Sequence, residues 1–397
     1  MSVSVTLYPV SSEQDLRSRL QGEGFVPVGK ISLPAGVFSC LALVAGLSSA
    51  DIFSVAAATA RRGDLTILQG RFSAGADDAL ALITGPALLR SLARCGRLPG
   101  KLSTELNRAL DVSALRSRQI SGCRRVLRLE RPGVMGILNV TPDSFYTESR
   151  QWRLDQALRQ GERLAAEGAD VIDVGGESTR PGAASVSLDQ ELERVVPVIE
   201  RLARELDCPL SVDTSKSRVA AAAVAAGADF VNDISGLQFD PAMARVVAES
   251  EAGLFLMHTR GSPREMQLDT DYVDLLGEVA ARLGEAIDRS LAAGVRQDRL
   301  AVDPGIGFGK SVEGNLTLLR HLKSLHGLGC PLLLGTSRKS FIGRVLGLAD
   351  PALRLSGSLA TVALGVAAGV QLFRVHDVRA TREAALMAWA ICHEQLP

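Results

Sequence analysis

The stretch from Val302 to Lys310 combines a fixed carboxylate with a permissive loop, an arrangement suited to ligand binding. Asp303 follows an apolar run, and Pro304 then ends that strand because proline lacks a backbone donor. Three alternating glycines let the backbone approach a ligand closely. The alternative is that Asp303 merely caps the following helix. A Walker A phosphate loop does not fit, because Pro304 stands where that motif needs glycine.

A second group of polar residues is suited to phosphate. Asn139 lies at the end of the apolar run Gly133–Val140, Arg374 lies in the apolar run Leu372–Val375, and His376 directly follows that second run. A guanidinium, an imidazole and an amide are donors that fit phosphate or pyrophosphate. Asn139 is alternatively a ligand of a Mg²⁺ that bridges a pyrophosphate, since Mg²⁺ takes few protein ligands besides phosphate oxygens.

Acceptor groups form a third set. Asp213, Asn232 and Asp303 each end an apolar run, and Lys339 follows another. A buried carboxylate pairs bidentately with a flat heterocycle that carries an amidine-like N–C(NH₂)–N edge. Asn232 both donates and accepts, so it suits the remaining ring edge. A purely structural role for Asp213 is the alternative.

The elements that position these side chains are eight short apolar runs alternating with helix-like segments such as Leu154–Glu167 and Ser187–Glu205. The runs are Gly133–Val140, Val171–Gly175, Leu210–Val212, Phe230–Val231, Leu254–Met257, Leu300–Val302, Leu332–Leu334 and Leu372–Val375. Near-continuous apolar strands indicate parallel strands buried on both faces. Eight such units over roughly 260 residues predict an α/β fold, the TIM (β/α)8 barrel, with the polar residues gathered at its C-terminal rim. An open doubly wound sheet is the alternative, although its G-x-G-x-x-G is missing.

Some of the rim residues have a simpler explanation. Ser215, Asp233 and Asp377 each stand where a helix begins, and we favour helix capping for these three. Capping does not explain the convergence of Lys339, Arg374 and His376.

The N-terminal part differs from the barrel. We predict a smaller α/β domain over residues 1–125, with strands at Val5–Tyr8 and Leu65–Leu68. Its expected helices are Ser12–Leu20, Asp77–Cys95 and Leu102–Leu110. The basic segment Ser113–Arg128 is interpreted as a linker into a barrel domain over residues 126–397.

Composition excludes several classes of function. Lys+Arg and Asp+Glu both total 44 and aromatic residues make up 4%, which argues against binding of nucleic acid or a membrane surface. The six cysteines form no C-x-x-C pair, so we expect reduced, mostly buried thiols in a cytoplasmic protein. The N-terminus has neither the basic nor the apolar region of a signal peptide.

Four segments resemble the motifs of dihydropteroate synthase, in the same order: Gly136–Phe145, Gly175–Gly182, Asp303–Lys310 and Ser337–Ser340. The resemblance runs from Gly133 to the C-terminus. It implies condensation of 6-hydroxymethyl-7,8-dihydropterin pyrophosphate with p-aminobenzoate, giving 7,8-dihydropteroate and pyrophosphate. It also implies Mg²⁺ as cofactor and a homodimer formed through barrel helices.

The resemblance assigns roles to matching positions. The implied pterin-binding residues are Asp213, Asn232, Met257, Asp303, Phe308, Gly335 and Lys339. The implied pyrophosphate-binding residues are Asn139, Arg374 and His376, with Asn139 at the Mg²⁺. The implied p-aminobenzoate site consists of Thr179, Arg180, Pro181, Phe308 and Ser340. Those implied to act in catalysis are Asp213, Asp303, Lys339, Arg374 and His376.

One segment departs from the family pattern. Tyr146–Arg150 replaces a Ser-Asp-Gly-Gly sequence that is common in the family, and both Asp143 and Glu148 are candidates for its acid. A pterin-dependent methyltransferase, which uses a similar pocket with a corrinoid partner, is an alternative function. A non-catalytic pterin-binding paralogue is another.

Overall fold

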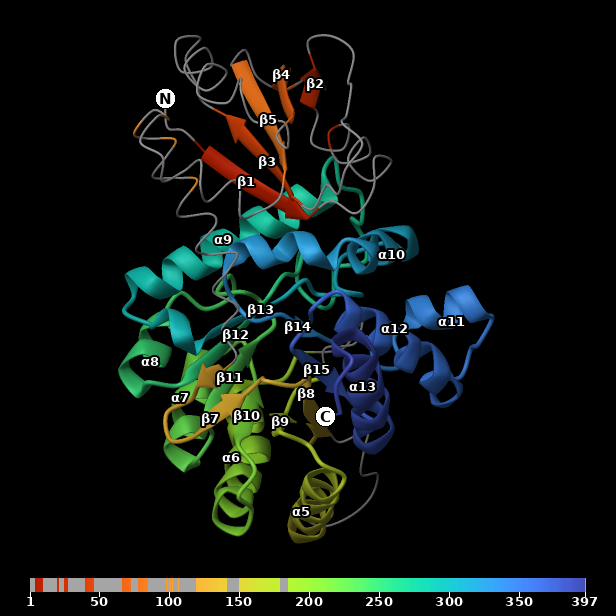
Figure 1. Cartoon of the computed structure of the whole chain (residues 1–397). Coiled ribbons are helices and arrows are strands. Elements are labelled where there is room, and N and C mark those ends of the chain that lie inside the picture. Colours follow the sequence, from red (N-terminus) through yellow and green to blue (C-terminus); the bar gives the residue numbers. More distant parts are fainter. Residues whose placement is uncertain are drawn as a thin grey trace. The chain divides into compact units, whose positions relative to one another are not determined.

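The computed structural model describes residues 119–140, 150–178 and 185–396, and of the N-terminal part only five strands and five single residues. Its contacts divide the chain into two compact units. One unit comprises residues 1–116 and 323–329, and the other comprises residues 117–322 and 330–397. Figure 1 traces both units.

The second unit contains a sheet of eight parallel strands. They are β8 (Gly133–Asn139), β9 (Val171–Gly175), β10 (Leu210–Asp213), β11 (Phe230–Asp233), β12 (Gly253–Met257), β13 (Leu300–Asp303), β14 (Leu333–Leu334) and β15 (Leu372–Val375). Their order is β13-β12-β11-β10-β9-β8-β15-β14. A parallel bridge between Val302 and Leu332 joins the two ends of this order, so the sheet closes into a barrel. The predicted eight-stranded α/β barrel is confirmed.

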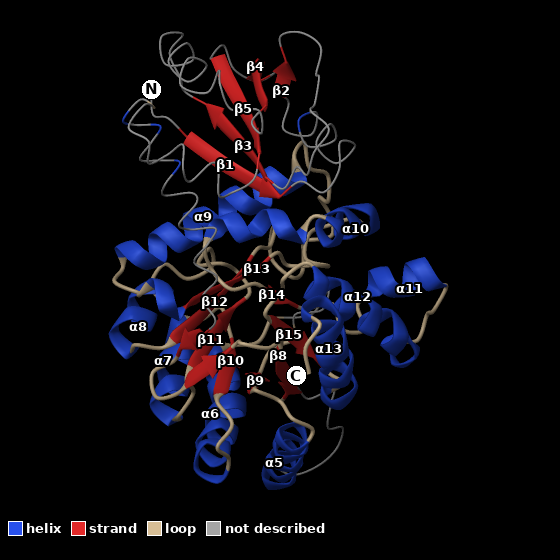
Figure 2. Cartoon of the chain, in the orientation of Figure 1, coloured by secondary structure: helices blue, strands red, loops and turns tan. Residues whose placement is uncertain are grey.

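Helices surround these strands (Figure 2). They are α5 (Arg150–Ala166), α6 (Leu188–Glu205), α7 (Ser217–Ala226), α8 (Met243–Ser250), α9 (Leu275–Ala292), α10 (Val312–Arg320), α11 (Ser340–Leu346), α12 (Leu355–Ala367) and α13 (Val378–His393). Short 3-10 helices cover Gln297–Arg299, Leu322–Leu328 and Pro351–Arg354. None of the helices in the described part has the length and apolar character needed to cross a bilayer.

Local sequence signals account for the helix positions. Ser187 caps α6 in a capping box with Gln190, and the buried stripe of α6 includes Val195, Val198 and Leu202. The helices expected over Leu154–Glu167 and Ser187–Glu205 are therefore confirmed as α5 and α6, to within a few residues at each end.

The barrel interior is apolar at its N-terminal end. Phe230 and Phe255 are fully buried there with rings 5.4 Å apart, in a cluster that also holds Met135 and Leu372. Because such a core is closely packed, it fixes the strand register and hence the positions of residues at the opposite rim.

Part of the expected linker is a two-stranded hairpin. Strand β6 (Gln119–Ser121) pairs antiparallel with β7 (Val126–Arg128), and Ile120 and Leu127 join the barrel core cluster. Arg125 donates to Asp229, directly before β11, through both its backbone N–H and its guanidinium. The hairpin is therefore attached to the barrel.

The described strands of the first unit form an antiparallel sheet, ordered β1-β3-β5-β4-β2. They are β1 (Ser4–Pro9), β2 (Phe25–Pro27), β3 (Cys40–Ala45), β4 (Thr66–Phe72) and β5 (Asp78–Thr84). The strands expected at Val5–Tyr8 and near Leu65–Leu68 are confirmed as β1 and β4. The helix expected from Asp77 is wrong over Asp78–Thr84, because pairing with both β3 and β4 overrides the helix propensity of its Ala and Leu residues.

Other expectations for this part are only partly described. Of the helices expected over Ser12–Leu20 and Leu102–Leu110, only Leu20, Leu102 and Leu106 are described, each as helical. The four cysteines whose side chains the structure describes are free thiols, but only Cys330 among these four is buried, fewer than expected.

Candidate active site

Arg374 is the centre of the polar cluster at the barrel mouth. From β15, its Nε donates to Asp173 Oδ2 of β9 and its terminal nitrogen to Asp213 Oδ2 of β10, both at 2.6 Å. Asn232 of β11 donates to the same oxygen of Asp173 at 3.0 Å. These side chains meet because their strands are parallel and end at one rim. The sequence analysis put Arg374 and Asp213 in two different groups, but the Arg374 guanidinium is largely buried and lies against the carboxylates of both Asp173 and Asp213.

Two carboxylate oxygens of this cluster are open to a further donor. Asp173 Oδ1 and Asp213 Oδ1 are buried and have no hydrogen-bond partner among the described residues. A buried acceptor without a donor is costly, which suggests that a ligand group completes the cluster.

Asp303 occupies the end of β13, as expected. Its Oδ1 accepts the backbone N–H of Gly305 at 2.7 Å, and the carboxylate is buried. Gly305 and Gly307 have φ of +68° and +83°, so the loop takes a path that other residues rarely adopt. The glycine-rich stretch therefore folds over Asp303 as the sequence indicated.

Gly335, at the end of β14, marks the point where the site residues converge. A Cβ built on it would lie 3.7 Å from Asp303 Oδ2, 3.9 Å from Arg374 Cβ and 3.9 Å from Lys339 Nζ. Asp303 and Arg374 therefore face the same small space, which the missing side chain of Gly335 leaves open.

Lys339 and Phe308 lie together beside this space. The Lys339 ammonium stands 4.6 Å from the centre of the Phe308 ring and donates to the carbonyl of Ile306. Phe308 packs with Met257 in a small apolar cluster. Ser340, the first residue of α11, is exposed.

His376 and Asn139 complete the rim on the β15–β8 side. The His376 ring lies 3.0 Å from Ser337 Oγ, and its backbone N–H donates to the same oxygen. Asn139 Oδ1 and Asp213 Oδ2 lie 3.7 and 3.6 Å from the position of a Cβ at Gly175. The bare glycine thus leaves a space next to both oxygens.

Burial changes the acid–base properties of the cluster. Desolvation raises the pKa of Asp213 to about 7, although the Arg374 charge opposes the rise. Desolvation likewise raises the pKa of Asp303, against the charge of Lys339. It lowers the pKa of Lys339 to about 8, against the charge of Asp303. Desolvation also acts to lower the pKa of Arg374, but Asp173 and Asp213 outweigh it and raise that pKa.

Sequence reasoning assigned no role to three contributors. Asp173 lies inside β9, where an acidic residue in a buried strand was an available signal. Lys310 is buried and donates to Gly305 O, Phe308 O and His258 Nδ1 at 2.8–3.0 Å, which fixes the glycine loop. Burial lowers the pKa of Lys310 to about 7 and that of His258 to about 3.

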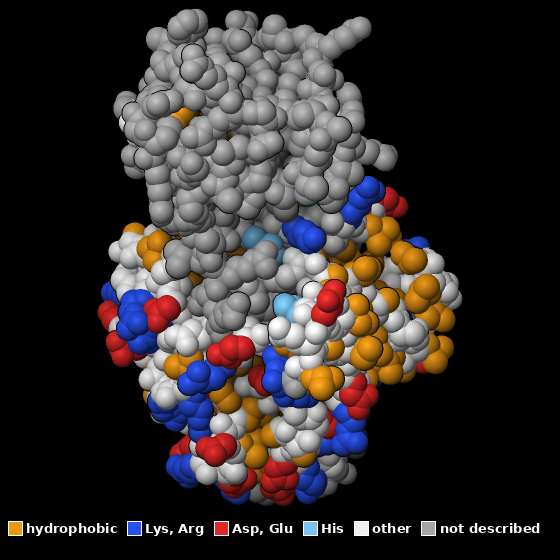
Figure 3. Space-filling view, in the orientation of Figure 1, with side chains coloured by type: hydrophobic (Ala, Val, Ile, Leu, Met, Phe, Trp, Pro, Cys, Tyr) orange, Lys and Arg blue, Asp and Glu red, His pale blue; other side chains and the backbone are white. Residues whose placement is uncertain are grey.

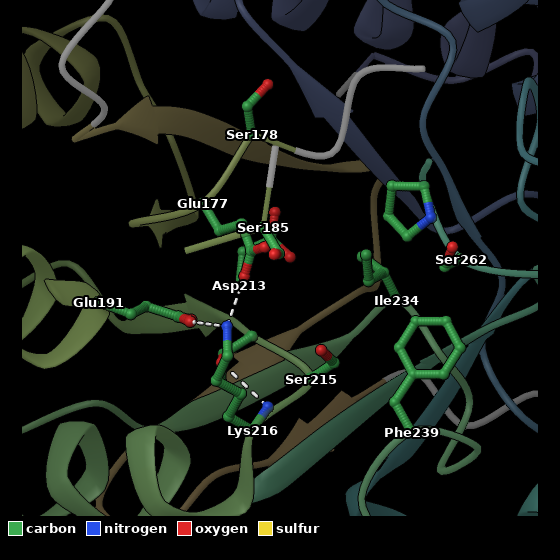
Figure 4. Close-up of a pocket in the computed structure, with 12 residues that line it drawn as sticks. Glu177, Ser178, Ser185, Glu191, Asp213, Ser215, Lys216, Ile234, Phe239 and Ser262 are labelled. Atoms are coloured by element: carbon green, nitrogen blue, oxygen red, sulfur yellow. Dashed lines mark hydrogen bonds and ion pairs between the residues drawn. The ribbon is translucent and has the colours of Figure 1, made fainter. Parts of the chain in front are cut away.

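The third contributor is Lys216, which lies between Glu177 and Glu191 with both contacts at 2.5 Å (Figure 4). Glu177 also accepts the N–H of Val186 at 3.0 Å, so it ties residue 186 to the end of β9. These groups line a pocket of about 230 Å³ that reaches Asp213 and includes Ile234 and Phe239.

Several expected site residues cannot be placed. Thr179, Arg180 and Pro181 lie outside the described residues, as do Asp143 and the segment from Tyr146 to Ser149.

The described residues hold no group of three or more His, Cys, Asp or Glu side chains that suits a metal ion. Mg²⁺ needs no such group when substrate phosphates and water supply most of its ligands. A single amide oxygen from Asn139, beside the space at Gly175, fits that mode of binding.

The fold and the site together define a (β/α)8-barrel enzyme. Buried carboxylates and asparagine amides line the mouth of its barrel. The family model for pterin binding enzymes matches residues 135–376. The dihydropteroate synthase of Synechocystis sp. is 48% identical over 262 residues, which cover 66% of this chain and 91% of that protein.

Solved structures agree with this match. The Xanthomonas albilineans dihydropteroate synthase with 4-aminobenzoic acid is 45% identical with a TM-score of 0.66, covering 71% of this chain and 100% of that one. The same enzyme in complex with 7,8-dihydropteroate covers the same shares at 40% identity with a TM-score of 0.62. The chain belongs to the dihydropteroate synthase family of pterin-binding enzymes. It is a transferase with dihydropteroate synthase activity.

Proposed function

We propose that the barrel mouth binds 6-hydroxymethyl-7,8-dihydropterin pyrophosphate and p-aminobenzoate, with the residues described above in the following roles. The observation that carries this proposal is the convergence of Asp303 Oδ2, Lys339 Nζ and Arg374 on the space at Gly335. A carboxylate acceptor and an ammonium donor around a bare glycine fit the edge of a flat polar ring. The Arg374 guanidinium, which Asp173 and Asp213 hold in place, would meet the charged tail of such a ligand.

The pterin ring enters this space edge first. Asp303 accepts from the N–C(NH₂)–N edge, while Lys339 donates to the carbonyl side of the ring. Asn232 and the open oxygen of Asp213 meet the opposite edge. Met257 and Phe308 supply the apolar faces. This arrangement would satisfy the buried acceptor of Asp213.

The diphosphate lies toward Asn139, Arg374 and His376. Mg²⁺ held by Asn139 and phosphate oxygens would supply charge neutralisation of the leaving group. Arg374 donates to the diphosphate while remaining tethered to Asp173 and Asp213. His376 is oriented by Ser337, so its ring edge is held in place toward the tail.

The reaction breaks the C–O bond to the diphosphate and forms a C–N bond to the arylamine. Arg374 and His376 stabilise the negative charge that develops on the leaving oxygen. Asp213 and Asp303, once ionised, stabilise the positive charge that spreads into the pterin ring. The neutral amine needs positioning rather than a strong base, and it loses its extra proton to solvent after attack.

We assign the p-aminobenzoate site to Thr179, Arg180, Pro181, Phe308 and Ser340. Phe308 supports this assignment because its ring is held beside Lys339, next to the pterin space. Glu177 and Val186, which flank these residues in the chain, are joined by a hydrogen bond, and Glu177 also contacts Lys216 beside the mouth.

Release of pyrophosphate that depends on p-aminobenzoate tests this proposal. The purified chain should release one pyrophosphate per 7,8-dihydropteroate formed, and Asp303→Ala should abolish pterin binding. Methyl transfer with a corrinoid protein, without pyrophosphate release, would select the methyltransferase alternative. Pterin binding without turnover would select the non-catalytic paralogue.

We further propose a homodimer formed through the face of α11, α12 and α13. Large apolar side chains are exposed there, including Leu364, Met387 and Ile391 at 62–70% exposure. Figure 3 displays apolar side chains gathered on this side of the barrel. A contiguous exposed apolar face favours association. Sedimentation should give a dimer for the parent chain and a monomer for Leu364→Glu combined with Met387→Glu.

We propose that the N-terminal part of the chain forms an accessory α/β domain, which ends before Gln119 rather than at the expected residue 125. The attachment of the β6–β7 hairpin to Asp229 supports a boundary on the N-terminal side of Gln119. A chain that begins at residue 117 should therefore keep its turnover, and loss of turnover with an intact fold would assign the N-terminal part a role in the reaction.

A further inference from the structure

Arg338 has an unusual backbone for its position. It lies between Ser337 and Lys339 in the loop after β14, and its φ is +59°, in the left-handed region. A side chain other than Gly, Asn or Asp rarely adopts this conformation, and such strain persists only where the surroundings enforce it. The two flanking side chains contact His376 and Ile306, so the strained residue separates two groups of the mouth.

Hydrogen bonds of its backbone N–H, its carbonyl and its guanidinium hold Arg338 in this conformation. Its backbone N–H donates to Ser358 Oγ at 3.0 Å, and its carbonyl accepts from Arg354 at 3.0 Å. Its guanidinium forms a fork on Asp377, with Nε to Oδ2 at 2.9 Å and a terminal nitrogen to Oδ1 at 2.5 Å. A bidentate fork fixes orientation as well as distance.

The Asp377 carboxylate binds the Arg338 guanidinium and does not cap its own helix, α13. It stands at the N-cap of α13, where the sequence favoured a capping role, but its side chain makes no capping hydrogen bond. The carboxylate instead joins the loop after β14 to the loop after β15. Helix capping by Asp377, as expected from its position, is therefore wrong for its side chain.

The fork connects the immediate neighbours of two site residues. Arg338 precedes Lys339, whose ammonium borders the pterin space at Gly335. Asp377 follows His376, whose ring is held by Ser337. We propose that the Arg338–Asp377 pair is a positioning device that sets the separation between Lys339 and His376, and so matches the site to the length of a pterin diphosphate. This inference rests on the roles proposed above for Lys339 and His376.

The test compares Asp377→Asn and Arg338→Gly with the parent chain. Glycine accepts the left-handed backbone, so Arg338→Gly keeps the fold while removing the fork. Each variant should lower kcat/KM for the pterin diphosphate by about tenfold or more, because small misplacements of positioned groups are costly. The double variant should be no worse than the poorer single variant, since both break one interaction.

A matched control is Asp298→Asn. Arg296 makes the same bidentate fork on Asp298, at 2.9 and 2.7 Å, but before β13 at the opposite end of the barrel. This variant should keep kcat/KM. If Asp377→Asn and Arg338→Gly both keep kcat/KM within twofold while the melting temperature falls, the pair is merely structural and the inference is wrong.

Lys339→Met and His376→Ala, assayed in parallel, separate this outcome from failure of the proposed function. If these two variants also keep kcat/KM, the roles of Lys339 and His376 are wrong. If they lose it while the fork variants do not, the positioning inference alone fails.

Discussion

The substitution Gly335→Ala should weaken pterin binding while leaving the folded state intact. The added methyl would lie 3.7 Å or more from its nearest neighbours, which is ordinary contact, and Gly335 is not among the glycines with positive φ. We therefore expect the folded state to tolerate alanine, with a gain of about 0.4–1 kcal/mol from the restricted unfolded chain. The methyl nevertheless projects into the space between Asp303 and Lys339.

The pterin ring would have to share that space. Crowding by one methyl in a closely packed site costs about 1–3 kcal/mol. Because each 1.4 kcal/mol is tenfold, the Kd of a pterin ligand should rise roughly 5- to 150-fold. Titration calorimetry with the pterin, beside a thermal melt of the same sample, measures both quantities.

A control places the same methyl elsewhere. Gly314→Ala in α10 adds a Cβ 3.3 Å from Leu275 of α9, a flexible neighbour outside the mouth. It should leave the pterin Kd unchanged. A parental Kd for Gly335→Ala, with the variant folded, would refute the placement of the pterin between Asp303 and Lys339.

Four further predictions concern the charged groups. Burial raises the pKa of Asp213 to about 7, so the carboxylate that stabilises the pterin cation forms as pH rises through 7. A plot of kcat/KM against pH should therefore rise around pH 7. The Asp213→Asn variant should lack this rise. The protonated Asp213 carboxyl favours folding fully below its unfolded pKa of about 3.9, and this contribution is lost as pH rises to the folded pKa of about 7. The melting temperatures of the parent and of Asp213→Asn should therefore diverge in favour of the variant between about pH 4 and pH 7 and differ by a constant amount above that range. Arg374→Ala leaves Asp173 and Asp213 buried without their cation and should lower the free energy of unfolding, measured by urea titration, by about 3–5 kcal/mol. Adding Asp173→Asn to this variant should restore part of the lost stability. An unchanged free energy of unfolding in Arg374→Ala would show that the cation is dispensable there. Glu177→Gln weakens the ion pair with Lys216. In initial-rate assays it should raise the KM for p-aminobenzoate several-fold more than the KM for the pterin substrate. Equal effects on the two KM values would contradict a role of this ion pair in p-aminobenzoate binding.

The barrel was predictable because each of its strands is a short apolar run that ends in a polar residue. Parallel strands bring those ends to one rim, so the convergence of Asp303, Arg374 and Lys339 followed from the order of the runs alone. The β5 strand at Asp78–Thr84 was missed because its Ala and Leu residues favour a helix locally, while two neighbouring strands decide the outcome.

The contacts between site residues were less accessible to sequence reasoning. The pairing of Arg374 with Asp173 depends on the registers of β15, β8 and β9, which put their side chains side by side. The left-handed backbone of Arg338 could not be predicted from the sequence, because this conformation is typical of glycine or asparagine and not of arginine. Tertiary contacts alone determine both features.

A crystal structure of the chain with pterin diphosphate and Mg²⁺ tests the central claim most directly. We predict that the N–C(NH₂)–N edge lies on Asp303, with the diphosphate between Asn139 and His376 and in contact with Arg374. A pterin bound instead in the pocket of Lys216 and Phe239, with Asp303 unoccupied, would contradict it.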